Sequence, residues 1–350
     1  MASSARPAYE RPDWTPLRVE QAIDAQQPII DAHHHLWDRE SSTYLASELR
    51  ADVEDSHNIT RTVFVECSAE YDHDATAQMA PVGETRFVAA QADDMAQISR
   101  ARIGAIVSHA DLTLGDAVEP VLAAHAEAGA GLFRGVRHGT NWSRHDSVKN
   151  GHHNPIEGQM AQPDFRRGVA VLGRMGFSYD AWFYFDQLVE LADLAHAVPE
   201  TTIIVNHLGG PLGIGPHTGA GRLEMLETWQ AGIEAAAACP NVVLKIGGIG
   251  MEHYYGTPWA DLPRPPSSEV VAAWWSEVVR FAIDTFGPDR CLAESNFPVD
   301  RQTLPYTVLW NALQIMTAGY SVDERNQIFH DTAARVYRID TTPVPSPGAN

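Results

Sequence analysis

The chain has 350 residues, 44% of them hydrophobic, and its 25 basic against 45 acidic side chains give a formal net charge of −20. Such a surface repels nucleic acid and anionic membranes but does not exclude a locally basic binding site. The three cysteines (Cys67, Cys239, Cys291) show neither a disulfide framework nor zinc spacing, and the N-terminus lacks an apolar signal segment. No run of about 18 apolar residues is present. We therefore expect a cytoplasmic protein with no nucleic-acid or membrane partner.

The first 28 residues hold one short candidate helix, residues 17–25, and four prolines: Pro7, Pro12, Pro16 and Pro28. This pattern predicts an arm, residues 1–28, that packs on the base of the following domain or on a neighbouring subunit. A loose terminus is the alternative, because terminal segments are ordered only where contacts hold them.

A histidine-rich strand end follows the arm. Residues 29–38 read I-I-D-A-H-H-H-L-W-D, in which two β-branched residues lead into alternating polar positions. Side chains alternate across a strand, so we expect Asp31, His33 and His35 to share one face. Two histidines at one strand end can bind one metal ion or one substrate oxygen, so this stretch predicts a metal or catalytic site. A histidine-rich turn without a role is the alternative.

Further apolar runs predict seven more strands, and nearly all of them end in polar residues. In chain order, these expected strands are residues 60–67, 102–112, 132–138, 177–185, 201–207, 241–247 and 290–300. Apolar residues at helical spacing predict helices between them, at residues 116–128, 188–194, 223–238, 265–286, 303–318 and 323–337. Residues 81–97 look helical only in parts, and residues 86–90 are a candidate edge strand.

Eight strands that alternate with helices predict an α/β fold, a single-domain (β/α)8 TIM barrel over residues 29–340, with a flexible tail at residues 341–350. The active site of such a barrel lies at the carboxyl ends of its strands. The alternative is an open doubly wound sheet, which requires a glycine-rich turn directly after the first strand. Residues 33–35 are histidines instead, so we favour the barrel.

A series of motifs lies at the expected strand ends: D-A-H-H-H, F-R-G-V-R-H, Y-D-A-W, N-H-L-G-G-P, L-K-I-G-G and E-S-N-F-P-V-D. In this order and spacing they resemble the amidohydrolase superfamily. The branch most similar contains TIM-barrel hydrolases of the amidohydrolase-2 type, among them L-fucono- and L-rhamnono-lactonases and 2-pyrone-4,6-dicarboxylate lactonase. The resemblance covers residues 29–339 and implies a barrel that hydrolyses a lactone ring.

The resemblance implies catalytic roles for three histidines. His33 and His35 match the pair at strand 1, and His207 matches the histidine after strand 6. In metal-free relatives these histidines polarise the lactone carbonyl, whereas in others they contribute to a divalent metal site, most often zinc. Three protein ligands and a water are the usual arrangement of catalytic zinc. Zinc held by these three residues and a metal-free site both stay open.

The resemblance also implies an anion-binding group at strand 4. Arg134 and Arg137 match the arginines of the family, and a guanidinium suits a substrate carboxylate. These two face opposite ways on a regular strand, so we favour Arg137, with His138 beside it, for substrate binding. Lys245 on strand 7 is a further candidate for binding an anionic group. A core lysine paired to a carboxylate is its alternative.

Aromatic residues flank the strand ends and predict walls of a pocket for a ring-shaped substrate. We assign Trp182 and Tyr184 to substrate binding, with core packing as the alternative. The full set is Trp37, Trp142, Trp182, Tyr184 and Phe297.

One position departs from the family pattern. Relatives mostly read G-S-D-W-P at strand 8, where the aspartate is a general base or metal ligand, but this chain has Asn296 in E-S-N-F-P. An amide can orient a water but cannot take its proton. Three replacements are open: in order of preference, a metal that acidifies the water, Glu66, or Glu294.

The leading functional hypothesis is a hydrolase that opens a lactone or related cyclic ester of a carboxylated or sugar-derived small molecule. A metal-dependent decarboxylase on the same barrel and a non-catalytic small-molecule binder are the alternatives. A homo-oligomer is compatible with the sequence, which does not decide the oligomeric state.

Overall fold

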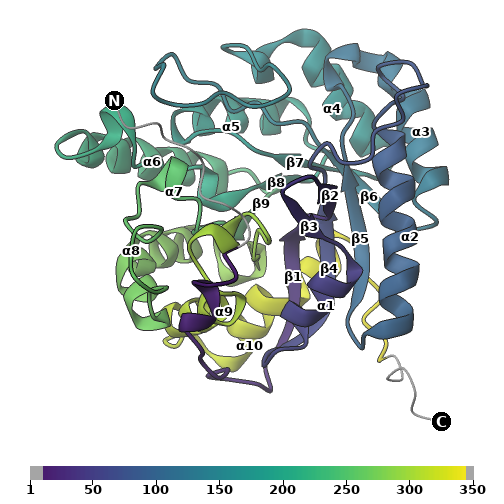
Figure 1. Ribbon diagram of the computed structural model, residues 1–350. Coiled ribbons are helices and arrows are strands. Elements are labelled where there is room, and N and C mark those ends of the chain that lie inside the picture. The colour runs from purple at the N-terminus through teal and green to yellow at the C-terminus, as the bar shows by residue number, and fades with distance from the viewer. Residues whose placement is uncertain (1–10, 344–350) are drawn as a thin grey trace.

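The computed structural model describes residues 11–343, in which eight parallel strands form one sheet wrapped by helices (Figure 1). Each barrel strand pairs with the next along the chain. The last strand returns to the first, because the Asn296 N–H donates to the His33 carbonyl (2.8 Å) and the His35 N–H donates to the Phe297 carbonyl (2.7 Å). These bonds confirm the expected (β/α)8 barrel. Its strands are β1 (Pro28–His34), β4 (Asn58–Val65), β5 (Arg102–Ser108), β6 (Phe133–Arg137), β7 (Ser178–Ala181), β8 (Ile203–Val205), β9 (Val242–Ile246) and β10 (Cys291–Ala293).

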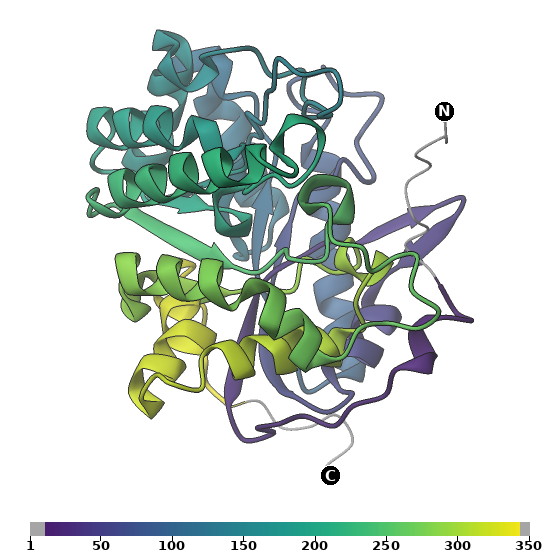
Figure 2. The same cartoon turned by 90° about the vertical axis from the view of Figure 1, so that its left-hand side faces the viewer.

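Helices cover the outer face of the sheet and lie side by side around it (Figures 1 and 2). None of the described helices is long and apolar enough to span a bilayer. A small hairpin, β2 (Trp37–Arg39) and β3 (Ser42–Tyr44), follows β1. The helices are α1 (Ala46–Val53), α2 (Val82–Ile98), α3 (Glu119–Ala128), α4 (Pro163–Arg174), α5 (Leu188–Ala197), α6 (Gly221–Ala237), α7 (Glu252–Tyr255), α8 (Ser268–Phe286), α9 (Tyr306–Met316), α10 (Val322–Asn326) and α11 (Thr332–Val336).

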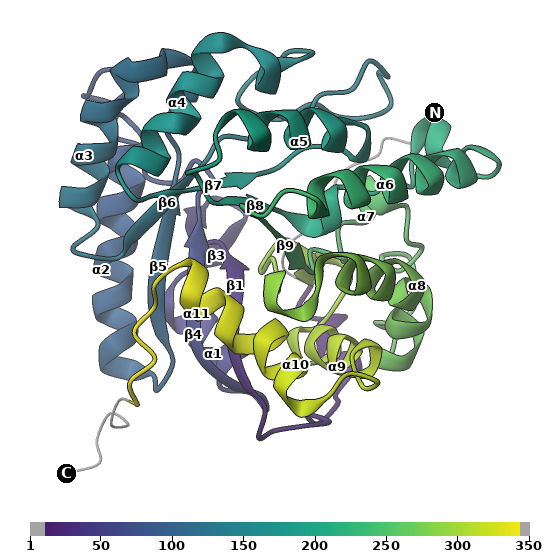
Figure 3. The ribbon, with the colours of Figure 1, turned by 180° about the vertical axis from the view of Figure 1, so that it is seen from behind.

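Two apolar layers stabilise the barrel, one between sheet and helices and one inside the sheet. The inner layer includes Ile30, Val63 and Leu292 and ends on Tyr337, just after α11. The Tyr337 carbonyl accepts from Arg134 Nε (2.8 Å), near the amino end of β6. Its hydroxyl donates to Asp180 inside the barrel (2.9 Å). The C-terminal segment, in yellow in Figure 3, therefore plugs the amino-terminal end of the barrel.

The pairing of β1 with β4 is irregular where the histidines begin. Asp31 pairs with Thr62 and His34 with Phe64, so three steps along β1 match two along β4. A bulge of this kind inverts the alternation of side chains beyond it.

Because of this bulge, the prediction that Asp31 shares a face with His33 and His35 is wrong. Asp31 Oδ2 accepts from the Ser295 hydroxyl (2.6 Å) and from Tyr306 of α9 (3.0 Å), so it points toward α9. The rings of His33 and His35, in contrast, contact each other in the mouth of the barrel, with centroids 4.9 Å apart.

Two predicted elements are wrong. Residues 86–90 are not a strand but part of α2, a single helix whose buried Val88, Ala92 and Met95 recur at helical spacing. Residues 17–25 are not a helix, because only a short 3-10 turn, Thr15–Leu17, precedes irregular chain.

The described part of the N-terminal arm packs on the barrel of the same chain. Trp14 Nε1 donates to the Leu262 carbonyl (2.7 Å), and the Ile23 N–H donates to Asn311 Oδ1 of α9 (3.0 Å). The purple segment in Figure 2 follows this path beside the green helices. Residues 1–10 of the predicted arm and residues 344–350 of the predicted tail lie outside the described residues.

Because Tyr337 closes the amino-terminal end of the barrel, we expect its substitution to have a large effect on stability. Tyr337→Ala removes a fully buried aromatic side chain, so we expect it to lower the free energy of unfolding by about 3–5 kcal/mol. Urea denaturation measures this loss. Val322→Ala, at a 71% exposed position of α10, is the control and should change stability by less than about 0.5 kcal/mol. Equal effects of the two substitutions would contradict the plug.

Candidate active site

Buried polar side chains meet at the carboxyl ends of the barrel strands, where the barrel fold predicts an active site. The predicted histidines are together: the His33 ring lies 4.9 Å from that of His35 and 4.6 Å from that of His207, centroid to centroid. The whole group comprises His33, His35, Glu66, Arg137, His207, Lys245 and Glu294, all buried.

Glu294 holds His207 through one carboxylate oxygen. Oε1 accepts from both the His207 backbone N–H (3.1 Å) and its Nδ1 (2.7 Å). With the proton on Nδ1, the lone pair of His207 is on Nε2, in a ring that lines a cavity. Burial lowers the pKa of His207, and the Glu294 carboxylate partly offsets that effect. His207 is therefore a neutral base at pH 7, oriented by a carboxylate.

Two glycines after β9 make room for this pair. A Cβ on Gly248 would lie 2.3 Å from His207 Nδ1, and one on Gly247 would lie 2.6 Å from Glu294 Cγ. His207 itself has φ of +52°, in the left-handed region that non-glycine residues rarely adopt. The I-G-G sequence at the end of β9 is thus a steric requirement of the His207–Glu294 contact.

His33 lies between two cations. Lys245 Nζ is 3.2 Å from its Nδ1, and Arg137 Nη1 is 3.4 Å from its Nε2. Burial and the neighbouring Lys245 ammonium hold the pKa of His33 well below its usual range. Glu294 Oε2 is 3.0 Å from His33 Nδ1 but accepts no hydrogen bond from the described residues.

Asn296 links His35 to a buried acid. Its side-chain amide spans His35 Nε2 (3.2 Å) and Asp300 Oδ1 (2.8 Å). His35 Nδ1 donates to the Val65 carbonyl (2.7 Å), so Nε2 of the neutral ring must accept. Burial raises the pKa of Asp300 well above its usual range. In the structure Asn296 Nδ2 donates to Asp300 Oδ1 and Asn296 Oδ1 faces His35 Nε2. Turning the amide by 180° would let its NH2 donate to His35 Nε2 while its oxygen accepts from a protonated Asp300.

Glu66, another predicted replacement for the missing aspartate, is held by Arg137. Arg137 Nε donates to Glu66 Oε1 (2.8 Å), and a second guanidinium nitrogen donates to the Glu66 carbonyl. Burial opposes ionisation, but the guanidinium keeps the pKa of Glu66 well below its usual range. A carboxylate engaged in this way is a weak base, so Glu294 is better placed than Glu66 to assist proton transfer.

A cavity of about 580 Å³ opens above these residues. Its lining includes Arg137 and Trp182, predicted to bind substrate, and His35, His207 and Asn296, predicted to be catalytic. The volume suits a small-molecule ligand.

Three residues predicted to bind substrate lie elsewhere. His138 lines a neighbouring cavity of about 690 Å³. Tyr184 is fully buried, and Asn141 Nδ2 donates to its hydroxyl (3.1 Å). Lys245 is fully buried and 2.8 Å from Asp180 Oδ1, as in the core-pair alternative. Substrate binding by these residues stays a prediction, and this geometry does not favour it.

The inner histidines fit a divalent cation poorly. The ligand atoms of His33, His207 and Glu294 lie within 4.8 Å of one another. However, Glu294 contacts His207 at hydrogen-bond length, and both ring nitrogens of His33 face a cationic side chain. A metal bound to His33 would have to displace Lys245 or Arg137 from its ring nitrogens. Zinc binding by His33, His35 and His207 stays a prediction from the sequence.

Among the three predicted replacements for the aspartate Glu294 comes last, and the sequence motifs predict no role for His152 or His153. Glu294 lies 87 positions from His207, so no local pattern joins them, although the two glycines of L-K-I-G-G were a signal of close packing. His152 and His153 lie in an irregular loop and contact Glu66. The only sequence signal for a role of these two residues was that two histidines follow each other in G-H-H-N.

Comparison with known proteins gives relatives over almost the whole chain. The family whose sequence profile matches residues 30–339 is described as amidohydrolase. An uncharacterised protein, y4mH of Sinorhizobium fredii, is 31% identical over 333 residues, covering 89% of this chain and 98% of that protein. The L-fucono-1,5-lactonase of Burkholderia multivorans is 24% identical, covering 89% of this chain and 96% of that protein.

Solved structures share the fold. An amidohydrolase from Burkholderia multivorans with bound zinc superposes with a TM-score of 0.69 at 23% identity, covering 89% of this chain and 99% of that one. A Pseudomonas putida protein described as a 2-pyrone-4,6-dicarboxylic acid hydrolase has a TM-score of 0.61 at 15% identity, covering 89% and 98%. The profile match spans the barrel and its site residues, and the 31% identical relative covers 89% of the chain. The chain belongs to the amidohydrolase family.

Proposed function

We infer that this amidohydrolase-family protein hydrolyses a lactone or related cyclic ester of a carboxylated or sugar-derived small molecule. The observation that carries this inference is the His207–Glu294 pair. It supplies a neutral, carboxylate-oriented imidazole at the cavity wall, in a chain that lacks the aspartate at strand 8. Relatives described as an L-fucono-1,5-lactonase and a 2-pyrone-4,6-dicarboxylic acid hydrolase support the substrate class.

The proposed reaction needs one base and one cation from the chain. His207 Nε2 takes a proton from a water as its oxygen attacks the lactone carbonyl. Arg137 Nη1, beside His33, balances the negative charge that develops on the carbonyl oxygen or pairs with a substrate carboxylate. The tetrahedral intermediate collapses by breaking the ring C–O bond, and the His207 imidazolium returns its proton to the leaving oxygen. Lactone and water thus become a hydroxy acid.

We favour hydrolysis over the two alternatives. A metal-dependent decarboxylase needs a cation where Lys245 and Arg137 already face His33. A non-catalytic binder gives no reason for a buried carboxylate that orients the base form of a histidine at a cavity wall.

Glu294→Gln tests the base. The variant keeps the side-chain shape but removes the charge that stabilises the His207 imidazolium, so we expect kcat to fall by about 10²–10⁴-fold on the lactone that is turned over. Wild-type kcat/KM should fall as the pH drops through the pKa of His207, which lies below 6.5. Since Glu294 raises that pKa, the acid limb of the variant should lie at still lower pH.

Glu84→Gln is the matched control for this experiment, because burial raises the pKa of Glu84 to about 8 and the amide replaces a neutral acid. Its pH–rate profile should match that of the wild type. An unchanged rate and acid limb in Glu294→Gln would exclude His207 as the carboxylate-assisted base. Wild-type protein that turns over no aldono- or pyrone-lactone, with or without added zinc, would overturn the proposed function itself.

Arg137→Lys tests anion recognition. Lysine keeps the charge but loses the planar fork, so we expect KM to rise by about 10-fold or more for carboxylated lactones and much less for neutral sugar lactones. Steady-state kinetics on matched substrates measure the difference. Arg134→Lys, on the same strand but bonded to the Tyr337 carbonyl, should leave both KM values unchanged. Equal changes for both substrate types would contradict the assigned role.

A further inference from the structure

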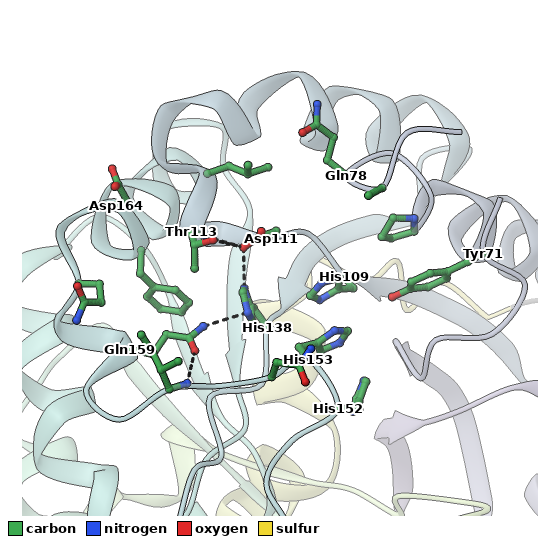
Figure 4. A pocket seen from close by; sticks show the side chains of 17 residues that line it. Tyr71, Gln78, His109, Asp111, Thr113, His138, His152, His153, Gln159 and Asp164 are labelled. Carbon is green, nitrogen blue, oxygen red and sulfur yellow. Dashed lines mark hydrogen bonds and ion pairs between the residues drawn. The ribbon is translucent and has the colours of Figure 1, made fainter. Parts of the chain in front are cut away.

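A second cavity, of about 690 Å³, lies beside the catalytic one, and His152 lines both. Figure 4 shows His109, His152 and His153 together along this second cavity. The proposed hydrolysis uses none of these histidines.

Three side chains in this region are spaced like ligands of one ion. The carboxylate of Glu66 and one ring nitrogen each of His152 and His153 all lie within 4.8 Å of one another. Glu66 Oε2 is 3.4 Å from His153 Nε2 and 3.6 Å from His152 Nε2. These distances are long for ion-paired hydrogen bonds, which are typically about 2.8 Å. Zinc bonds of about 2.0–2.1 Å at tetrahedral angles place ligand atoms roughly 3.3 Å apart, close to the spacing here.

The two carboxylate oxygens of Glu66 contact different partners. Arg137 Nε takes Oε1, whereas Oε2 faces the two histidines. Unlike His33 in the catalytic site, His152 and His153 have no cationic side chain against their ring nitrogens among the described residues. His152 is 53% exposed, so water screens the site and can complete the coordination.

His109 positions the His153 ring. The two imidazoles stack with centroids 3.6 Å apart and 2° between their planes. His109 Nδ1 donates to the Arg137 carbonyl (3.1 Å). This contact leaves Nε2, in a ring only 7% exposed that lines the cavity, without a partner among residues 11–343. An imidazole nitrogen without a protein partner, in a ring that lines the cavity beside the cluster, adds a further possible ligand atom to this region.

The loop that carries the histidines is held at its base. The Gly151 N–H donates to the Asn141 carbonyl (2.9 Å), and the Ser143 N–H donates to Asn150 Oδ1 (2.6 Å). A Cβ on Gly151 would lie 2.3 Å from Asn141 Oδ1, so a larger residue there would have to displace the buried Asn141 amide. The chain therefore presents His152 and His153 to Glu66 before any ion binds, which reduces the entropic cost of binding.

We propose that Glu66, His152 and His153 form a second divalent-cation site, with water as the remaining ligand, distinct from the catalytic histidines. Two imidazoles and one carboxylate are a donor set for a borderline metal such as Zn²⁺ or Co²⁺ rather than for Ca²⁺ or Mg²⁺. A bound ion joins the loop to the end of β4. Because Glu66 also holds Arg137 and His152 also lines the catalytic cavity, the ion fixes one wall of the substrate site.

Cobalt binding tests the site independently of catalysis. Full-length protein freed of metal with a chelator is titrated with Co²⁺, followed by visible absorption and by metal analysis after gel filtration. We expect one equivalent with a tetrahedral spectrum. The double variant His152→Ala/His153→Ala should weaken binding of this ion by more than about 100-fold, beyond the 10–100-fold typical for loss of an outer partner. His145→Ala, an exposed histidine of the same loop, is the matched control and should bind like the wild type.

The variants of the catalytic site separate this inference from the proposed function. Glu294→Gln should retain the cobalt equivalent, whereas a loss of cobalt in Glu294→Gln but not in the double variant would place the ion at the barrel centre and overturn the proposal. Absence of binding to the wild type at micromolar Co²⁺ would also overturn it. Circular dichroism checks that each variant folds. The single variant His152→Gln, at a half-exposed position, must show weakened binding if the double variant does not fold.

Discussion

The buried carboxylate of Glu294 is the interaction on which the barrel mouth depends. A carboxylate removed from water is costly unless hydrogen bonds and opposite charges compensate it. Here the compensation comes from the backbone and ring of His207, with Lys245 close by against His33. The same requirement explains why glycines end β9, since any Cβ there would occupy the space of Glu294 or His207. One buried charge thus dictates the chain conformation on two neighbouring strands.

The charges around Glu294 form a chain of pairs rather than a metal-binding cluster. Lys245 neutralises Asp180, and Arg137 neutralises Glu66, while the histidines between them stay neutral because of burial. Such alternation keeps the electrostatic cost of burial low and leaves the guanidinium as the cation at the cavity wall. Asn296 is consistent with this arrangement. An aspartate there would place a second buried acid beside Asp300, whereas the amide contacts both Asp300 and His35.

Glu66 lies between the two cavities and contacts a different group on each side. Arg137 takes one oxygen on the catalytic side, and the loop histidines face the other oxygen. Binding on one side of such a carboxylate alters the charge available on the other. The loop is therefore joined to the guanidinium of Arg137, which we propose to bind substrate, through the single side chain of Glu66.

The amino-acid sequence by itself determined the barrel, because apolar runs of strand length and apolar residues at helical spacing are local patterns, and eight strands that alternate with helices admit few folds. It also located His33, His35, His207 and Arg137 at strand ends, through motifs that each occupy a short stretch. Tertiary structure alone decided the face of Asp31, since the bulge depends on register with β4. It likewise decided that Glu294 rather than Glu66 reaches His207, and that His152 and His153 reach Glu66. Those contacts join residues more than 80 positions apart, and register, loop path and burial of charge are properties of the folded chain that no local pattern encodes.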